Sequence, residues 1–414
     1  MKKILALILT AAFLYSCEKQ VEKIDYTLIS DEERLEAAIE IARNTIVVDG
    51  HVDLPYRMKV GGFTLQREIL DVSERTDGGN FDYPRSKEGG LDAPFMSIYL
   101  PSGYQVSGGA KILADSLILM TERLAKTWPD KFAMANSPDE IEANFEKGLI
   151  SLPMGMENGA GIEDDLSNVK YFYDRGIRYI TLTHGKDNLI GDSSYDTTAT
   201  HGGLSEFGRE VVREMNRLGI MVDISHVSDN TFFDVLQTTK APVIASHSSA
   251  RKFTPDFERN MSDDMIKALG ENGGVIMINF GGSFIDGTYN EKSGEVREHV
   301  VNWLAENGLN RSDSAAQVYI KQYAAANNPF PNVAKVADHI DHVVRLVGIN
   351  HVGLGSDFDG VGDSLPNGLK DVSMYPNLFA ELLKRGYSKE DIQKICSQNI
   401  FRVWRQAEKF AIES

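Results

Sequence analysis

The sequence predicts an α/β fold, a single (β/α)8 TIM barrel, on three observations. Eight short apolar segments are spread along the 414 residues, and helical patterns separate most of them. Repeated strand–helix alternation implies parallel strands joined by right-handed crossovers. Six of the eight segments are followed by a titratable or metal-binding type of side chain. All six lie at the same strand end, where barrel enzymes build their sites.

The predicted strands are short and apolar, and several carry β-branched residues, as buried parallel strands do. In chain order they are Thr45–Asp49, Phe95–Leu100, Leu149–Met156, Arg178–Thr183, Ile220–Ser225, Pro242–Ser246, Gly274–Asn279 and His351–Ser356. Ser205–Leu218 illustrates the helices between them. Phe207, Val211 and Met215 share one face of this segment, and Gly219 ends it.

Length and composition favour one barrel-sized domain with insertions. The hydrophobic content of 42% is ample for a large core. We expect the domain to span residues 35–414, with a loop over the barrel mouth near 57–92 and a partly helical insertion near 284–332. The net charge of −17, without a basic stripe, argues against a nucleic-acid partner.

The N-terminus has the pattern of an export signal. Lys2 and Lys3 precede an apolar run that is too short to span a bilayer and fits a signal peptide. Leu14-Tyr15-Ser16-Cys17 resembles a bacterial lipobox, in which Cys17 is lipidated and becomes the mature N-terminus. The alternative is an ordinary signal peptide with an incidental cysteine.

We therefore expect a signal peptide over residues 1–17 and a tether over 18–34. The protein would be an exported cell-envelope lipoprotein, anchored to a bacterial membrane through Cys17. The other cysteine, Cys396, lies in a helical pattern and is expected to be buried by packing.

Three imidazoles and two carboxylates follow separate predicted strands: His51, Asp53, Glu157, His226 and His247. In His51-x-Asp53 the period of two sends both side chains to the same side of an extended backbone. Each histidine alone is most simply a hydrogen-bonded side chain at a strand end. Together the five form a ligand set for Zn²⁺ or a similar ion. Five ligands exceed the need of one tetrahedral ion and suit two ions, with Glu157 as the natural bridge.

Other titratable residues have separate expected roles. Asp357, after the eighth strand, is a candidate metal ligand or general acid and base, with a capping carboxylate as the alternative. His184 is better placed to polarise a substrate carbonyl than to bind metal, with a core histidine as the alternative. Asp359 is expected to cap or orient its loop. His339 and His342, three residues apart on a predicted helix, are expected to be structural.

The chain resembles the membrane dipeptidases, also called renal dipeptidases, a family of zinc metallopeptidases. The resemblance runs in order from about residue 45 to 405. It is carried by Asp49-Gly50-His51-Val52-Asp53, Gly155-Met156-Glu157-Asn158-Gly159, Leu182-Thr183-His184, Asp223-Ile224-Ser225-His226-Val227-Ser228, Ser246-His247-Ser248-Ser249-Ala250 and Gly355-Ser356-Asp357-Phe358-Asp359-Gly360.

The resemblance implies a barrel of the metal-dependent hydrolase type with two zinc ions. It implies His51, Asp53 and Glu157 on one ion, and Glu157, His226 and His247 on the other. The implied reaction is hydrolysis of a dipeptide by a hydroxide that bridges the two ions.

The resemblance also implies roles in substrate binding and proton transfer. His184 would contact the substrate, and Asp357 would shuttle the proton. Arg259, followed by Asn260, matches the arginine that binds the substrate carboxylate, and Arg251 is the weaker candidate. The family often forms dimers, so a homodimer is an expectation.

Two departures from the family pattern bear on side-chain preference. Asn158 replaces a glycine, and the segment Asn279-Phe280-Gly281-Gly282 lacks the aromatic residue expected near the substrate. One alternative function is a related barrel amidohydrolase, a deacylase of N-acyl or D-amino acids, which would share every metal ligand. Another is a lipid-anchored protein that binds peptides without cleaving them. The complete ligand set and Asp357 argue against a binder, which would need neither.

Overall fold

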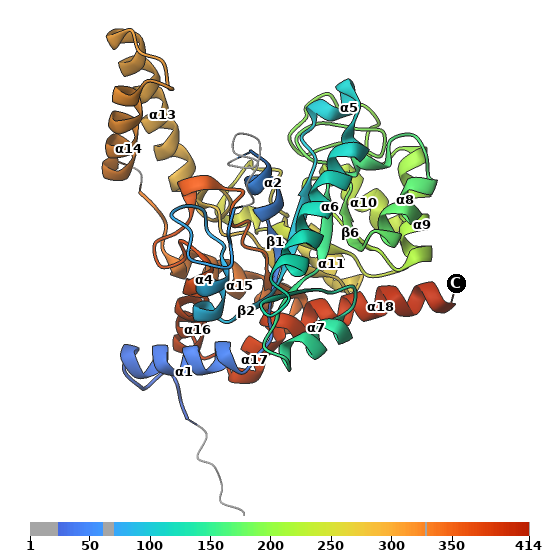
Figure 1. The fold of residues 1–414 in the computed structure, drawn as a ribbon, viewed down its shortest axis with the longest axis horizontal. Helices are drawn as coiled ribbons and strands as arrows, with labels where there is room; N and C mark the ends of the chain where they lie inside the picture. The colour runs from blue at the N-terminus through green and yellow to red at the C-terminus, as the bar shows by residue number, and fades with distance from the viewer. Residues whose placement is uncertain (1–23, 61–69, 328, 414) are drawn as a thin grey trace, which may run out of the picture.

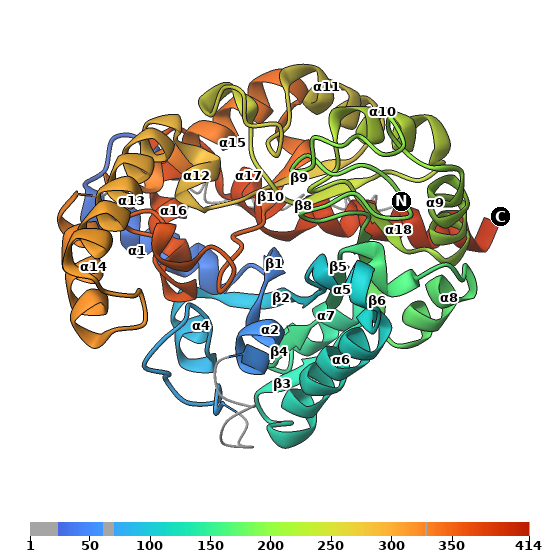
Figure 2. The ribbon, with the colours of Figure 1, turned by 90° about the horizontal axis from the view of Figure 1, so that it is seen from above.

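The computed structural model describes residues 24–60, 70–327 and 329–413, and a parallel barrel of eight strands forms its centre (Figures 1 and 2). The predicted fold is confirmed. Neighbouring strands pair in parallel in the order of the chain. The barrel strands are β1 (Val47–Val52), β2 (Leu91–Tyr99), β5 (Met154–Glu157), β6 (Ile177–Thr181), β7 (Met221–Asp223), β8 (Ile244–Ser248), β9 (Val275–Ile278) and β10 (Val352–Leu354).

The barrel is nearly closed between its first and last strands. Val52 forms a parallel bridge with Phe358, beyond the end of β10. The backbone N–H of Asp357 donates to the carbonyl of His51 (3.1 Å), and that of Asp53 donates to the carbonyl of Phe358 (2.9 Å). Closure therefore places the segment after β1 directly beside Asp357.

The barrel interior is filled by side chains rather than left as a pore, as is usual for this fold. Phe95 of β2 packs against Tyr179 of β6, with ring centroids 5.2 Å apart. Phe95 also packs against Trp404 of α18 (5.3 Å), and all three are buried. In Figure 1, α18 runs along the end of the barrel opposite α2.

The third predicted strand is two strands in the structure. Ile150–Leu152 forms β4, which pairs with β3 (Phe132–Met134) in a separate two-stranded sheet. The barrel strand β5 begins after Pro153. Proline has no N–H to offer a sheet, but the carbonyl of Pro153 accepts from the N–H of Met96 (2.8 Å). Pro153 thus ends the β3–β4 pairing, and its carbonyl makes the first hydrogen bond between β2 and the segment that leads into β5.

Helices surround the barrel (Figure 2). They are α1 (Asp31–Arg43), α2 (Leu54–Met58), α4 (Tyr83–Gly89), α5 (Gly103–Ser107), α6 (Ala110–Thr127), α7 (Pro138–Phe145), α8 (Ser167–Asp174), α9 (Glu206–Leu218), α10 (Asp229–Thr238), α11 (Asp263–Glu271), α12 (Gly282–Ile285), α13 (Gly287–Asn307), α14 (Ser314–Asn327), α15 (Val333–Val347), α16 (Tyr375–Lys384), α17 (Lys389–Gln393) and α18 (Asn399–Glu413). A π-helical turn, Lys394–Gln398, joins α17 to α18 and contains Cys396, which is buried as predicted.

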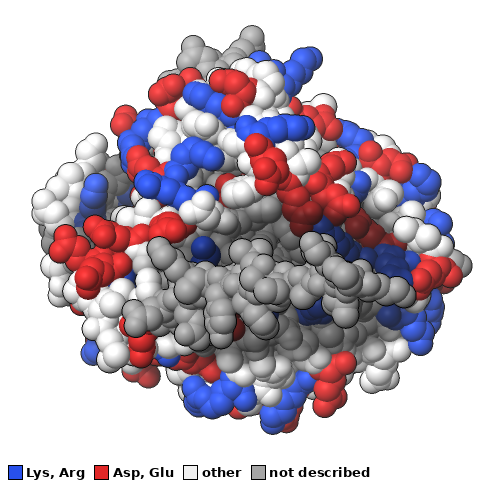
Figure 3. All heavy atoms as spheres, turned by 90° about the horizontal axis from the view of Figure 1, so that it is seen from below, with Lys and Arg blue, Asp and Glu red and all other residues white. Residues whose placement is uncertain are grey.

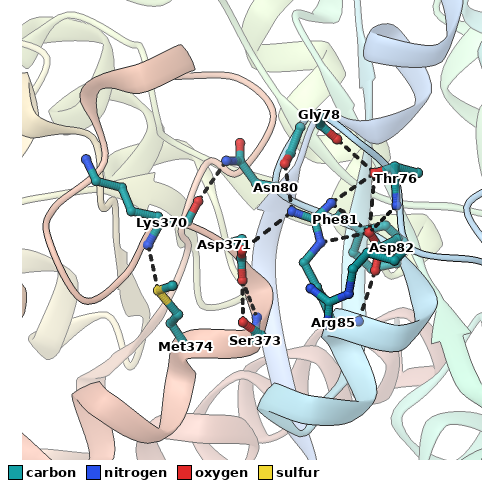
Figure 4. A network of polar contacts seen from close by, with 12 residues as sticks. Thr76, Gly78, Asn80, Phe81, Asp82, Arg85, Lys370, Asp371, Ser373 and Met374 are labelled. Atoms are coloured by element: carbon teal, nitrogen blue, oxygen red, sulfur yellow. Dashed lines mark hydrogen bonds and ion pairs between the residues drawn. The ribbon is translucent and has the colours of Figure 1, made fainter. Parts of the chain in front are cut away.

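The described part of the segment near 57–92 contains α4 in addition to loop. Asp82 caps the N-terminus of α4, and its carboxylate accepts from the Nε of Arg85 (2.7 Å). The guanidinium of Arg85 also donates to the carbonyl of Gly79 (2.8 Å) and lies 3.5 Å from Asp371 (Figure 4). These contacts join the segment to the loop after β10. Residues 61–69 lie outside the described part.

The segment near 284–332 forms α12, α13 and α14. Figure 1 shows α13 and α14 as a hairpin that projects away from the barrel. Its own apolar cluster contains three buried residues, Val300, Leu304 and Ala316. The rings of Trp303 and Tyr319 stack beside this cluster, with centroids 3.7 Å apart.

The last residues assigned to the tether belong to α1. Ser30 and Glu33 form a capping box at its start, and Arg34 donates to the carbonyl of Tyr26 (2.9 Å). This cap fixes the helix start at Asp31.

Cys17 and the predicted signal peptide lie outside the described residues. Among the described residues, no helix combines the length and apolar character needed to cross a membrane. On the face opposite Figure 2, acidic and basic side chains are interspersed (Figure 3).

Candidate active site

Glu157, the last residue of β5, lies at the centre of the barrel mouth with four imidazoles around it. Its Oε2 is 3.3 Å from the Nε2 of His51. Its Oε1 is 3.1 Å from the Nε2 of His226, 3.4 Å from that of His247 and 3.5 Å from that of His184. The two carboxylate oxygens therefore face different sets of imidazole nitrogens.

Asp53 and Asp357 complete the cluster on the His51 side. An Oδ2 of Asp53 lies 3.5 Å from the Nε2 of His51, and Asp357 has an oxygen within 4.8 Å of both residues. The side chain of Asn279 donates to Asp357 (2.8 Å). A Cβ on Gly360 would lie 2.2 Å from oxygens of both Asp53 and Asp357. Glycine at this position lets the two carboxylates approach each other.

Two residues of the cluster have left-handed backbones. His226 has φ of +70° and Asp357 has φ of +62°. Such a conformation is uncommon for residues other than glycine, and it persists where the surrounding structure holds it. In both cases it follows the end of a barrel strand and turns the side chain into the mouth.

The donor atoms of the cluster fit a divalent cation. The side chains of His51, Asp53, Glu157, His226 and His247 are all buried. His51 Nε2 and Asp53 Oδ1 have no hydrogen-bond partner among the described residues. The Nε2 atoms of His226 and His247 face each other at 2.9 Å. Buried lone pairs that converge without donors are stabilised by a metal ion, and this set of nitrogen and oxygen ligands is one that zinc accepts.

The pKa values of the two central carboxyl groups move in opposite directions. Burial would raise the pKa of Glu157, but His51 and His184 hold it well below its usual range. Burial raises the pKa of Asp357 well above its usual value, and the neighbouring charge of Asp53 adds to this effect. Divergent pKa values in one pocket suit an acid–base role for Asp357, because a raised pKa makes its carboxylate a stronger proton acceptor.

A cavity of about 970 Å³ opens above the cluster. Glu157, His226 and Asp357 lie on its surface, together with aromatic side chains that the sequence did not single out. These are Tyr56, Tyr99, Tyr195, Phe284 and Tyr289. Tyr99 ends β2, and the other four lie in segments that follow β1, β6 and β9, so no sequence spacing relates them. They supply aromatic surface to the cavity, whereas Phe280 of the segment Asn279–Gly282 is buried.

The predicted substrate-contacting residues lie in or beside this cavity. His184 lines it, and its ring centroid is 4.7 Å from that of Tyr99. Arg259 is buried, and its guanidinium donates to the hydroxyl of Ser248 (2.7 Å) and the carbonyl of His247 (2.8 Å).

Arg259 and Arg251 differ in their charge partners. Within the described chain Arg259 has no acidic side chain at ion-pair distance, although it is buried. Arg251, the weaker candidate, forms an ion pair with Asp229 and donates to the carbonyl of Glu258 (3.0 Å). Arg259 is therefore the better candidate to receive an external anion.

The residues expected to be structural have internal partners. His339 accepts from the N–H of Ala250 (3.0 Å) and bonds to the carbonyl of Ile285 (3.1 Å), and burial lowers its pKa to about 4. His342 bonds to Asp263 (2.7 Å). Asp359 orients its loop as predicted, because its N–H donates to the side chain of Asn80 (2.8 Å) and its carboxylate pairs with Arg57 (3.1 Å).

A parallel barrel with a buried cluster of histidines and carboxylates at its carboxyl mouth belongs to the class of metal-dependent hydrolases. The chain is a member of the membrane dipeptidase family (peptidase family M19), whose sequence pattern matches residues 35–414. It is a metallo-dipeptidase.

Relatives of the chain agree with this assignment. Dipeptidase tcpJ of Claviceps purpurea is 35% identical over 370 residues, which cover 88% of this chain and 77% of the relative. Dipeptidase verJ of Clonostachys rogersoniana is 33% identical over 391 residues, which cover 92% of this chain and 89% of the relative.

Solved structures show the same fold. The crystal structure of the probable dipeptidase PvdM from Pseudomonas aeruginosa has a TM-score of 0.77 and 26% identity, and covers 92% of this chain and 100% of that one. A metallopeptidase from Rhodobacter sphaeroides, liganded with a phosphinate mimic of the dipeptide L-Ala-D-Ala, has a TM-score of 0.70 and 25% identity, covering 88% and 99%.

Proposed function

We propose that this enzyme hydrolyses dipeptides at two zinc ions bridged by Glu157. The observation that carries the proposal is the placement of the Glu157 oxygens, one beside His51 and the other beside His226 and His247. A carboxylate so placed can bind two ions at once. His51 and Asp53 would hold one of them, and His226 and His247 the other.

Bound zinc ions would supply a nucleophile at neutral pH, because coordination lowers the pKa of water from 15.7 to about 7. Asp357 takes the proton of the attacking water and returns it to the departing amine. Its raised pKa, due first to burial and then to Asp53, suits both steps. The hydrogen bond from Asn279 holds its carboxyl group in place (2.8 Å).

His184 and Arg259 orient the substrate. Burial lowers the pKa of His184. Its ring can donate one hydrogen bond to the developing oxyanion, and a donor of this kind contributes about 3–4 kcal/mol. Arg259 would pair with the free carboxylate of the dipeptide, which supplies the acidic partner that this buried cation lacks among the described residues. A fixed site for the C-terminus would explain selection of short peptides over proteins.

Substitution of the bridge tests the proposal. Glu157→Gln should abolish dipeptide hydrolysis and lower the zinc content, because a bridge needs two anionic oxygens. Activity against an alanine dipeptide and metal analysis of the same preparation give the two readouts. Glu163→Gln, on the exposed surface nearby, serves as the matched control. A fully active Glu157→Gln protein with two zinc ions would contradict the assignment.

The substrate comparison separates dipeptidase from deacylase. The solved Rhodobacter sphaeroides relative holds a mimic of L-Ala-D-Ala, which favours dipeptides, including those with a D-residue. We expect hydrolysis of Gly-Ala and Gly-D-Ala, and none of N-acetyl-alanine. Turnover of the acylated amino acid alone would favour the deacylase. Stoichiometric binding without product would favour a peptide-binding protein.

We also propose that Cys17 carries a lipid that anchors the exported protein to a bacterial membrane. The support is the sequence alone, the charged start, the apolar run and the lipobox-like Leu14-Tyr15-Ser16-Cys17. Fractionation of cells that express the full-length chain tests the anchor. A homodimer is proposed from the family alone, and sedimentation of the purified protein tests it.

A further inference from the structure

A buried phenol, that of Tyr179, contacts the ring nitrogen of His51 that faces away from Glu157. The Nδ1 of His51 lies 3.0 Å from the hydroxyl oxygen of Tyr179, and the same hydroxyl donates to the carbonyl of Gly50 (3.0 Å). A phenol carries one proton, and a carbonyl can only accept. Since that proton goes to Gly50, His51 must be protonated at Nδ1. In the neutral ring that a metal ligand requires, Nε2 then carries the lone pair, on the side of Glu157 Oε2, 3.3 Å away.

The barrel has a dedicated place for this phenol. Tyr179 lies on β6, is fully buried and packs against Phe95. A Cβ on Gly155 of the adjacent β5 would lie 2.0 Å from the Tyr179 ring. Glycine at residue 155 therefore makes room for the Tyr179 ring, whose hydroxyl reaches Nδ1 of His51.

His247 is held by a second chain that ends on a carboxylate. Its Nδ1 lies 2.7 Å from the hydroxyl oxygen of Ser246, which donates to Asp223 (2.6 Å). Asp223 also accepts from Thr181 and from the backbone N–H groups of Ser225 (3.0 Å) and Ser246 (2.9 Å). It acts as an acceptor throughout, so the Ser246 proton points to Asp223. His247 must then carry its proton on Nδ1 and present Nε2 to the mouth.

His226 has no such chain. Its Nδ1 is buried without a hydrogen-bond partner among the described residues. The two chains thus belong to His51 and His247, which the proposed function assigns to different ions.

We propose that Tyr179 and the Ser246–Asp223 pair are positioning residues, each of which sets the affinity of one ion. Tyr179 governs the ion held by His51, and Ser246 with Asp223 governs the ion held by His247. A partner that fixes the tautomer and orientation of a ligating histidine typically contributes 10- to 100-fold to metal affinity. This inference rests on the two-ion site proposed above.

Zinc titration of the metal-free protein against a chromophoric chelator tests the inference. The wild type should give two binding constants. Tyr179→Phe, which keeps the ring, should weaken one of them by about 10- to 100-fold and leave the other unchanged. Ser246→Ala should weaken the other one. The double variant should weaken both.

Controls remove a hydrogen bond of the same kind elsewhere. Tyr387→Phe loses a bond to Asp341 (2.8 Å), and Ser86→Ala loses a bond to the carbonyl of Asp82 (2.8 Å). Both should retain wild-type zinc affinities. Thermal unfolding of each metal-free variant reports loss of fold separately from loss of affinity.

The outcomes distinguish this inference from the proposed function. A wild type that binds fewer than two zinc ions contradicts the two-ion site. A wild type that binds two ions, with both constants unaffected or equally weakened in Tyr179→Phe and Ser246→Ala, contradicts the positioning roles alone.

Discussion

Asp92, the second residue of β2, is a buried carboxyl group at the end of the barrel remote from the reaction. It accepts one hydrogen bond, from the N–H of Val47 (3.1 Å), and is 5% exposed. Burial raises its pKa to about 7. The folded protein therefore binds this proton more tightly than the unfolded chain, whose Asp has a pKa of about 3.9.

The sign of this difference predicts a pH dependence of stability. The free energy of unfolding should fall as pH rises from about 4 to about 7, by up to about 4 kcal/mol from this group. Asp92→Asn should flatten that decline and be more stable than the wild type at pH 8. Urea unfolding of both proteins at pH 5 and pH 8 measures the effect. Parallel pH profiles for the two proteins would contradict it.

Single residues of the site could be predicted where a strand end exposes them. His51, Asp53, Glu157, His226 and His247 each follow an apolar run, and the structure brings all five together. Their supporting residues are less visible. Ser246 gives a weak signal, because it directly precedes a ligand. Tyr179 gives none, since 128 residues separate it from His51 and only the barrel joins them.

Among the elements, the segment around α4 depends on one buried ion pair (Figure 4). Asp82 is fully buried and Arg85 nearly so, and both also bond to Thr76. The same segment carries Asn80, which holds the loop of Asp359 beside the site. Removal of one partner from a buried pair leaves the other charge without compensation.

Asp82→Ala should therefore destabilise the protein by about 3 kcal/mol. The matched control is Asp174→Ala, which breaks an exposed pair with Lys170 (2.7 Å) and should cost less than about 1 kcal/mol. Denaturant unfolding compares the two. Equal losses would show that burial of the Asp82–Arg85 pair contributes nothing.

Elements could be predicted where local chemistry decides them. The helix expected over Ser205–Leu218 is α9, with Ser205 as its N-cap and Gly219 left-handed at its end. The division of β4 from β5 could not be foreseen from apolar content, because residues on both sides of Pro153 are equally apolar and differ in partner strand. The α13–α14 hairpin was expected only as partly helical, since its few core contacts leave a weak apolar pattern.

For the whole molecule, the metal site joins strands from both ends of the chain. Its ligands lie in or just after β1, β5, β7 and β8, and Asp357 follows β10. A metal that binds only the folded form stabilises it, by about 4 kcal/mol at a free concentration 1,000 times the dissociation constant.

Chelation should therefore lower the Tm, and added zinc should restore it. Differential scanning fluorimetry with and without EDTA measures the shift. Glu157→Gln should show a smaller shift, because it lacks the bridge. A wild-type Tm that is the same in EDTA and in zinc would contradict a metal that is bound only by the folded state.

The overall architecture was the most predictable level, because eight strand–helix units restrict the topology strongly. The closure between β1 and β10 could not be predicted in detail. It depends on hydrogen bonds beyond the strand ends, between residues separated by about three hundred positions of the chain.

The α13–α14 hairpin touches the cavity at its base and extends away from the barrel at its tip (Figure 1). Tyr289, near the start of α13, lines the cavity, whereas Gly308 and Asn310 at the turn are exposed. The turn is therefore an exposed site to which a fluorophore or an affinity tag can be attached without disturbing catalysis. A dye there would report substrate entry only through movement of the helix that carries it.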